Sequence, residues 1–240
     1  MEPTCTVNPS KVEIIFRDID FVKDHDKILE LYVKAFEDQQ QYINVSLASG
    51  QEHRDALYAI FDIRLSLVEK LTQQGAFMQV ATKDGTIVGA GGIAPNTCKS
   101  TTWDLVVSGV LLLPFKLGYA AFARAMKLGD STADSKVDPD GGKVMMMAVL
   151  PDLHGQGVGR SILKNLLQKW DDRGDLVLST QLESCVKFYS NLGFTLTAEV
   201  KKNGYSNWSM IRRKALNSDA QPTSDVHTLP TSVATGPSDT

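Results

Sequence analysis

The sequence predicts an α/β domain built on a mixed β-sheet. Three observations support this: short runs of β-branched and aromatic residues alternate with helical periodicity, a central apolar run leads through glycines into an amphipathic helix, and the pattern closes on a hairpin signal. Strands are expected at residues 12–16, 76–82, 86–94, 144–150, 176–181, 194–200 and 205–211. Helices are expected at residues 24–36, 52–73, 102–128, 158–170 and 184–192.

The first half of the chain contains two helical segments and one hairpin signal. Apolar residues recur at helical spacing in 24–36 and 52–73, and Gly75 is a good stop for the second helix. Asp84-Gly85 between two apolar runs is typical of a tight hairpin turn. Residues 102–128 form an apolar helical region that we expect to break near Pro114, because proline cannot continue the helical hydrogen bonds.

The second half carries the central strand. Residues 144–150 (VMMMAVL) are continuously apolar, which is typical of a strand covered on both faces. The segment 158–170 has apolar residues on one side only and predicts an amphipathic helix. Asn203-Gly204 predicts a final hairpin. His53 lies in polar surroundings and is expected at the surface, whereas Trp103 is expected in the core or in a pocket wall.

Length and charge limit the possible functions. The chain has 240 residues and a net charge of −3, so it offers no strong positive field for nucleic acid. No apolar stretch reaches the roughly 20 residues of a membrane span, and the three cysteines lack metal-ligand spacing. We therefore expect a cytoplasmic protein in a reducing compartment, with no metal. Residues 1–10 and 215–240 are expected to be disordered around one domain, 11–214.

The chemistry is concentrated in the glycine-rich segment after the central strand. Glycines let the backbone approach a ligand, and the free amides at the start of a helix favour an anion. A plain tight turn is the alternative interpretation. A nucleotide-hydrolysing P-loop is disfavoured, since Arg160-Ser161 follow Gly159 where lysine is needed.

A second glycine pattern matches a dinucleotide-binding motif but lacks the helix that should follow it. Residues 89–94 (GAGGIA) match the dinucleotide-binding pattern G-x-G-x-x-A and would suggest a nicotinamide oxidoreductase. Pro95 follows at once instead of an amphipathic helix. We therefore expect a glycine-containing strand in a hairpin.

Two segments carry a resemblance to a known family. His154-Gly155-Gln156-Gly157-Val158-Gly159 resembles the Q/R-x-x-G-x-G/A core of motif A of the GNAT superfamily. Residues 185–194 (CVKFYSNLGF) are similar to the end of its motif B, in the small-molecule-type branch. The resemblance implies a mostly antiparallel central sheet of about seven strands flanked by helices, with a splayed central strand and a C-terminal β-hairpin.

The resemblance also implies an acetyl-CoA site. The exposed backbone of the central strand would pair with the pantetheine arm, and the amides of the turn would hold the pyrophosphate. His154 stands where Gln or Arg is usual, and Cys185 replaces the usual Asn. The residues so assigned to the cofactor are Met147, Ala148, Val149, His154, Gly155, Gln156, Gly157, Val158, Gly159, Arg160 and Cys185.

The resemblance implies a catalytic role for Tyr189 as the acid that protonates the departing thiolate. The alternative is a tyrosine that only packs beside its aromatic neighbours. The usual glutamate base is replaced by Ser179, so the candidates are Glu183, a water chain, or an amine that is already deprotonated. An acyl-cysteine route through Cys185 would need an activating base, for which His154 is the candidate.

The expected activity is transfer of an acetyl group from acetyl-CoA to an amine, either a small molecule or a peptide. The acceptor pocket is expected from the helices in 36–74 and 102–128. The alternative function is a non-catalytic acyl-CoA-binding or protein-interaction module. The sequence leaves open whether the chain forms a homodimer.

Overall fold

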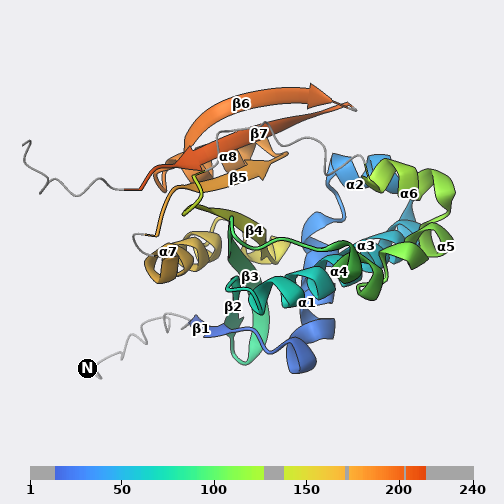
Figure 1. Cartoon of the computed structure of the whole chain (residues 1–240), viewed down its shortest axis with the longest axis horizontal. Helices are drawn as coiled ribbons and strands as arrows, with labels where there is room; N and C mark the ends of the chain where they lie inside the picture. The colour runs from blue at the N-terminus through green and yellow to red at the C-terminus, as the bar shows by residue number, and fades with distance from the viewer. Residues whose placement is uncertain (1–13, 127–137, 171–172, 203, 215–240) are drawn as a thin grey trace, which may run out of the picture.

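The sheet is the frame of the molecule (Figure 1). The computed structural model describes residues 14–126, 138–170, 173–202 and 204–214. Seven strands lie in the order β1-β2-β3-β4-β5-β7-β6, and all neighbours are antiparallel except β4 and β5. The expected fold class is confirmed. The strands are β1 (Ile15–Asp18), β2 (Phe77–Lys83), β3 (Thr86–Pro95), β4 (Gly142–Val149), β5 (Leu176–Thr180), β6 (Thr195–Lys202) and β7 (Tyr205–Arg212).

Helices cover both faces of this sheet. One face packs against α7, and the other against α1 and α3, each with its own apolar core. The helices are α1 (Phe21–Phe36), α2 (Gln40–Ser46), α3 (Gly50–Thr72), α4 (Thr102–Val107), α5 (Leu113–Leu117), α6 (Tyr119–Met126), α7 (Val158–Trp170) and α8 (Glu183–Ser190), with short 3₁₀ turns η1 (Val110–Leu112) and η3 (Pro151–Leu153).

Glycines in β3 allow α7 to pack closely on the sheet. A Cβ atom on Gly89 would lie 2.6 Å from Ile162 Cδ1, and one on Gly91 would overlap Met147 Sδ. Strand β3 forms a hairpin with β2 and pairs with β4 on its other edge. The glycine pattern at 89–94 is therefore explained by packing, and the expectation of a glycine-containing strand is confirmed.

The helical layer contains one element that the sequence did not predict. Helix α2 lies between α1 and α3 in the sequence and packs against α3 and α6, and His53 of α3 bonds both α2 and the C-terminal end of α1. His53 is 5% exposed, with Nδ1 2.7 Å from Ser46 Oγ and Nε2 2.8 Å from the Glu37 carbonyl oxygen. The expected surface position of His53 is wrong, because it lies on the inner side of α3 while its polar sequence neighbours face outward.

The apolar region 102–128 is divided more finely than expected. It forms α4, η1, α5 and α6, with Pro114 in the first turn of α5. Trp103 is 71% exposed, so its expected place in the core is wrong. The end of this region, together with residues 1–10 and 215–240, lies outside the described residues. Within the described part of the chain, no helix combines the length and apolarity needed to cross a membrane.

Candidate functional site

The site begins where β4 separates from β5. These strands pair only at Gly142 with Leu176 and at Lys143 with Val177, so the later part of β4 is unpaired on this side. A register shift against β3 between Ala90 and Gly92 marks a bulge in the middle of β4. The expected splayed central strand is present, and it leaves backbone groups of residues 147–149 facing an open space.

The bulge is held by a buried tyrosine. Met146 adopts a φ of 54°, a left-handed conformation that side chains other than glycine rarely take. The Tyr32 hydroxyl donates a 2.6 Å hydrogen bond to the Met146 carbonyl oxygen, and Tyr32 is fully buried. Helix α1 thereby fixes the strained residue from which β4 turns away from β5.

The glycine-rich turn presents free amides to the same space. Gly155 and Gly157 have φ values of 76° and 83°, which glycine adopts without steric cost. The first backbone bond of the following helix runs from Ser161 to Gly157. No acceptor among the described residues takes the preceding amides, and the helix dipole adds partial positive charge there. These amides belong to Gly155, Gly157, Val158, Gly159 and Arg160.

His154 is engaged with the strand. Its Nε2 lies 3.0 Å from the Val149 carbonyl oxygen and donates to it in the corresponding tautomer. The imidazole therefore links the turn to the end of β4. Gln156 bonds the Asp152 carbonyl oxygen with its Nε2 at 2.9 Å and does not line the cavity.

One cavity of about 530 Å³ joins these features. Every residue assigned to the cofactor from the sequence, except Gln156, lines it. The catalytic candidate Tyr189 lines it as well, whereas Glu183 does not. The remaining lining residues were not predicted as site residues: Ala35, Phe36, Gln39, Leu153, Leu182, Ser184 and Phe188. Phe188 and Leu153 stand inside or beside the two recognised motifs, but nothing local marks Ala35, Phe36 and Gln39.

Tyr189 and Cys185 lie on the cavity side of α8. Tyr189 is 9% exposed and contacts Phe188 and Phe194 edge-on at ring-centroid distances of 4.9 and 5.8 Å. Burial raises the pKa of the Tyr189 phenol well above 10, and the nearby Cys185 adds to this. Burial also raises the pKa of the Cys185 thiol. The thiol is thus protonated near neutral pH, which weighs against the acyl-cysteine route.

Glu183 occupies the first turn of α8 with an exposed side chain. A carboxylate at this place favours the helix through its dipole. Its role as the base stays a prediction. Ser179 sits on β5 opposite Ser209 of β7.

The comparisons with known proteins concern the domain family and the fold. Residues 117–196 match the model of the acetyltransferase (GNAT) domain. No curated protein sequence matches the chain.

Solved structures of acetyltransferases share the fold. A "histone acetyltransferase HPA2 and related acetyltransferase" from Corynebacterium glutamicum is 16% identical, with 85% of this chain and 98% of that chain covered and a TM-score of 0.59. A ribosomal-protein-alanine N-acetyltransferase from Brucella melitensis is 15% identical, with 83% and 99% covered and a TM-score of 0.53.

A third structure contains the cosubstrate. It is a putative acetyltransferase from Salmonella typhimurium with its cofactor acetyl-CoA, 17% identical, with 88% of this chain and 98% of that chain covered and a TM-score of 0.51. This chain therefore has the fold of the GNAT acetyltransferases and carries the GNAT acetyltransferase domain signature in residues 117–196.

Proposed function

We propose that the protein transfers the acetyl group of acetyl-CoA to an amine by direct attack in a ternary complex, with Tyr189 as general acid. One observation carries the proposal. A single cavity joins the free amides at the start of α7, the unpaired edge of β4 and the Tyr189 side chain. An anion-binding helix start beside an open strand edge suits a long cofactor with a pyrophosphate at one end.

Each part of the cofactor has a matching protein surface. The pyrophosphate would accept hydrogen bonds from the amides of residues 155–160, with Arg160 adding charge. The pantetheine arm would pair with the backbone of residues 147–149, which β5 leaves free. The thioester would then lie between the splayed strands, near Tyr189 and Cys185.

The proposed reaction uses neither a metal nor a covalent enzyme intermediate. The amine lone pair attacks the thioester carbonyl and forms the C–N bond. The C–S bond breaks and its electron pair stays on sulfur, which takes the proton of the Tyr189 hydroxyl. The nitrogen loses its extra proton to water, and water returns a proton to the phenolate.

The environment of Tyr189 favours a neutral phenol. Because its pKa is raised by burial, the proton remains in place throughout the usual pH range. Ionisation of this phenol is therefore not expected to set the alkaline limit of activity. The same burial disfavours the phenolate, so proton transfer should be coupled closely to departure of the thiolate.

The base is left to solvent in this scheme. Glu183 is exposed and outside the cavity lining, and Ser179 replaces the usual glutamate. Water, or an amine that arrives deprotonated, accepts the proton. Activity should then rise with pH as the free amine fraction of the acceptor rises.

A non-catalytic acyl-CoA-binding module is the second candidate. It is favoured by Cys185 and Ser179 at positions where the family usually has Asn and Glu. Such a module would bind acetyl-CoA but acetylate no amine.

The variant Tyr189→Phe tests the proposal, since it removes the hydroxyl and keeps the ring. Single-turnover transfer to an accepted amine should fall about 100-fold or more, with acetyl-CoA affinity nearly unchanged by calorimetry. Tyr119→Phe is the matched control, because Tyr119 is 79% exposed and outside the cavity lining. Normal single-turnover rates in the Tyr189 variant would show that the tyrosine only packs. Tight acetyl-CoA binding without transfer in a broad amine screen would favour the binding module.

A further inference from the structure

One wall of the candidate cavity is left unused by the proposed cofactor contacts. Ala35 and Phe36 line the cavity from the end of α1, and Gln39 lines it from the residue before α2. These three residues, called the α1 wall below, lie outside both recognised motifs. The proposed cofactor contacts come instead from β4 and from the turn before α7. The α1 wall is therefore available to the second substrate.

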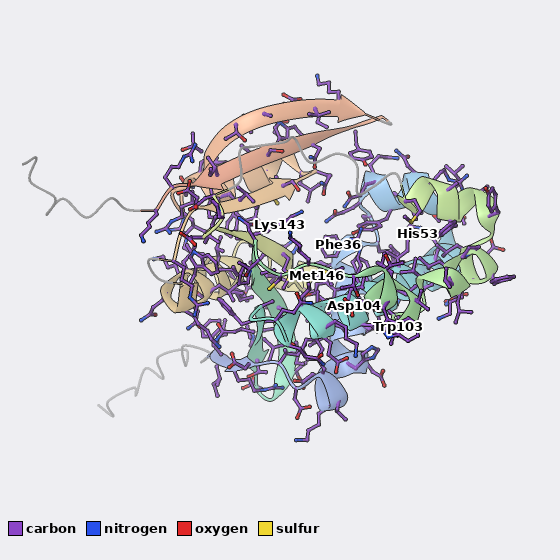
Figure 2. All side chains as sticks on the ribbon, in the orientation of Figure 1. Phe36, His53, Trp103, Asp104, Lys143 and Met146 are labelled. Atoms are coloured by element: carbon purple, nitrogen blue, oxygen red, sulfur yellow. The ribbon has the colours of Figure 1, made fainter. Side chains whose placement is uncertain are left out.

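The α1 wall lies beside the unpaired part of β4. Tyr32, four residues before Phe36, bonds the Met146 carbonyl oxygen at 2.6 Å, and residues four apart share one side of a helix. Phe36 and Met146 also pack against the same apolar core, and Figure 2 shows them near one another. Phe36 and Met147 both line the cavity. The wall thus faces the strand segment along which the acetylated arm of the cofactor would lie.

The two substrates would reach the cavity from opposite faces of the sheet. Helix α7 and Tyr189 of α8 belong to the apolar core on one face, whereas Phe36 packs against the core on the other face. A Cβ atom on Gly159 would lie 3.7 Å from Phe188 Cζ, so the Phe188 ring stands at the cofactor turn. The space between β4 and β5 connects the two faces, since these strands pair only at their first two residues. An acceptor that approaches the thioester from the α1 face therefore passes the α1 wall.

The Phe36 ring is held in place by an aromatic cluster. Its centroid lies 6.1 Å from that of Tyr32, 5.7 Å from that of Tyr42 and 5.2 Å from that of Phe61. The Phe36 side chain is half-buried, and the residue lines the cavity. A ring fixed in this way offers a preformed apolar surface, on which an apolar or aromatic group packs with little loss of side-chain entropy in the protein.

Charge in the cavity is placed away from the α1 wall. Gln39 accepts a 3.1 Å hydrogen bond from Gln41 Nε2 through its Oε1, so the wall has an amide where a carboxylate would be the same size. Among the described residues that line the cavity, Arg160 is the only lysine, arginine, aspartate or glutamate, and it lies at the start of α7. A charged group on the acceptor would lose water at the α1 wall without an opposite charge from these residues, which is costly.

We infer that the α1 wall binds the apolar body of the acceptor, so that the substrate is an amine with an aromatic or aliphatic body and no second charged group. Phe36 supplies the packing surface, and Gln39 keeps the wall uncharged. This inference rests on the proposed acetyl transfer and names the substrate class of the same site. It excludes amino acids, which carry a carboxylate, and polyamines, which carry further ammonium groups.

The test compares three amines with the same body: benzylamine, 4-(aminomethyl)benzoate and 1,4-bis(aminomethyl)benzene. In the wild-type protein, kcat/KM for benzylamine should exceed that for either charged analogue about 10-fold or more, because a charged group placed against an apolar wall loses its hydration without compensation. The two equivalent amines of the third compound are counted in this comparison. A charged analogue that is acetylated as efficiently as benzylamine would overturn the inference while leaving acetyl transfer intact.

Variants of the α1 wall identify the residues responsible. Gln39→Glu keeps the size of the side chain and the acceptor of the Gln41 bond, and it adds a negative charge at the wall. It should shift the preference toward 1,4-bis(aminomethyl)benzene about 10-fold, the effect of one added charge partner. Gln40→Glu is the matched control, because the neighbouring Gln40 is exposed and outside the cavity lining, and it should leave the ratios unchanged. Unchanged ratios in Gln39→Glu would refute the placement of the acceptor at this wall.

Phe36→Leu tests the packing surface itself. It keeps the wall apolar but removes the flat ring, so kcat/KM should fall for benzylamine and stay nearly constant for ethylamine, whose body is too short to cover a ring. Equal falls for both amines would count against a packing role for Phe36. If the variant fails to fold because the aromatic cluster is disturbed, the Gln39→Glu comparison still decides the inference.

If no amine is acetylated, the proposed function fails, and calorimetry then tests the wall without turnover. The probes are N-benzylacetamide and its 4-carboxy derivative, each titrated into the protein with coenzyme A present. Tighter binding of N-benzylacetamide supports an apolar wall, whereas equal binding of the two probes, or no binding of N-benzylacetamide, overturns it. Circular dichroism on each variant, together with retained acetyl-CoA affinity, identifies any variant that fails to fold.

Discussion

Tyr32→Phe should weaken both the fold and the cofactor site. The substitution keeps the ring, which stacks on Phe61 at 5.5 Å, and removes only the hydroxyl that bonds the Met146 carbonyl oxygen. Leaving a buried backbone acceptor without this donor costs about 1–3 kcal/mol. For a domain of this size, each kcal/mol lowers Tm by about 2–4 °C, so we expect a drop of about 2–12 °C.

Tyr32→Phe should also weaken acetyl-CoA binding, because the lost hydrogen bond holds the strained residue Met146 in place. Met146 has a left-handed φ of 54°, a conformation that costs about 1–3 kcal/mol and persists only where its surroundings fix it. If the bulge relaxes, β4 can pair further with β5 and cover the backbone that would bind pantetheine. Differential scanning calorimetry and acetyl-CoA titration measure the two effects. Tyr119→Phe, which removes an exposed hydroxyl, is the control. A Tm and an affinity both equal to those of the wild type would refute this account of the bulge.

Three further predictions follow from the described contacts. Gly157→Asp adds a side chain and a negative charge at the proposed pyrophosphate site and should abolish acetyl-CoA binding by calorimetry. The control Gly85→Asp lies in the β2–β3 turn and imposes a similar left-handed strain, since φ is 76° at Gly85 and 83° at Gly157, so it should retain binding. Asp24 accepts two hydrogen bonds from the Arg17 guanidinium, and these lower the pKa of the Asp24 carboxyl below 3.8. The ionised carboxylate therefore stabilises the fold above the unfolded pKa, and this stabilisation is lost as pH falls through the folded pKa. Asp24→Asn should accordingly flatten the fall of Tm below about pH 4. Because burial raises the pKa of Tyr189 well above 10, the single-turnover rate should show no alkaline decline between pH 8 and 10, and a decline lost in Tyr189→Phe would contradict this assignment.

Local signals in the sequence were sufficient for most of the fold. The helix at 158–170 has the same bounds in the structure, because one apolar face and a glycine start define it. The hairpins at Asp84-Gly85 and before Gly204 follow from turn chemistry that only a few residues satisfy. Helix α2 was missed, since its seven residues are too short to show a clear helical period.

The predictions that were wrong concern the burial of single side chains. His53 was expected at the surface from its polar neighbours, yet it is buried because its ring bonds the ends of α1 and α2. Trp103 was expected inside, yet its α4 helix has no buried residue. Burial of a single side chain depends on how helices pack together, and that information is not contained in a short segment.

The sequence by itself determined the glycine-rich turn of residues 154–160 and the strand–turn–helix order around it, because glycine conformation and helix-start amides act within a few neighbouring residues. Only the tertiary structure decided which distant groups complete the site. Tyr32 reaches Met146 across 114 positions, and Phe36 at the end of α1 and Gln39 before α2 line the cavity. These juxtapositions arise from packing α1 and α3 on the face of the sheet opposite α7, where long-range apolar contacts, rather than local backbone preference, fix the geometry.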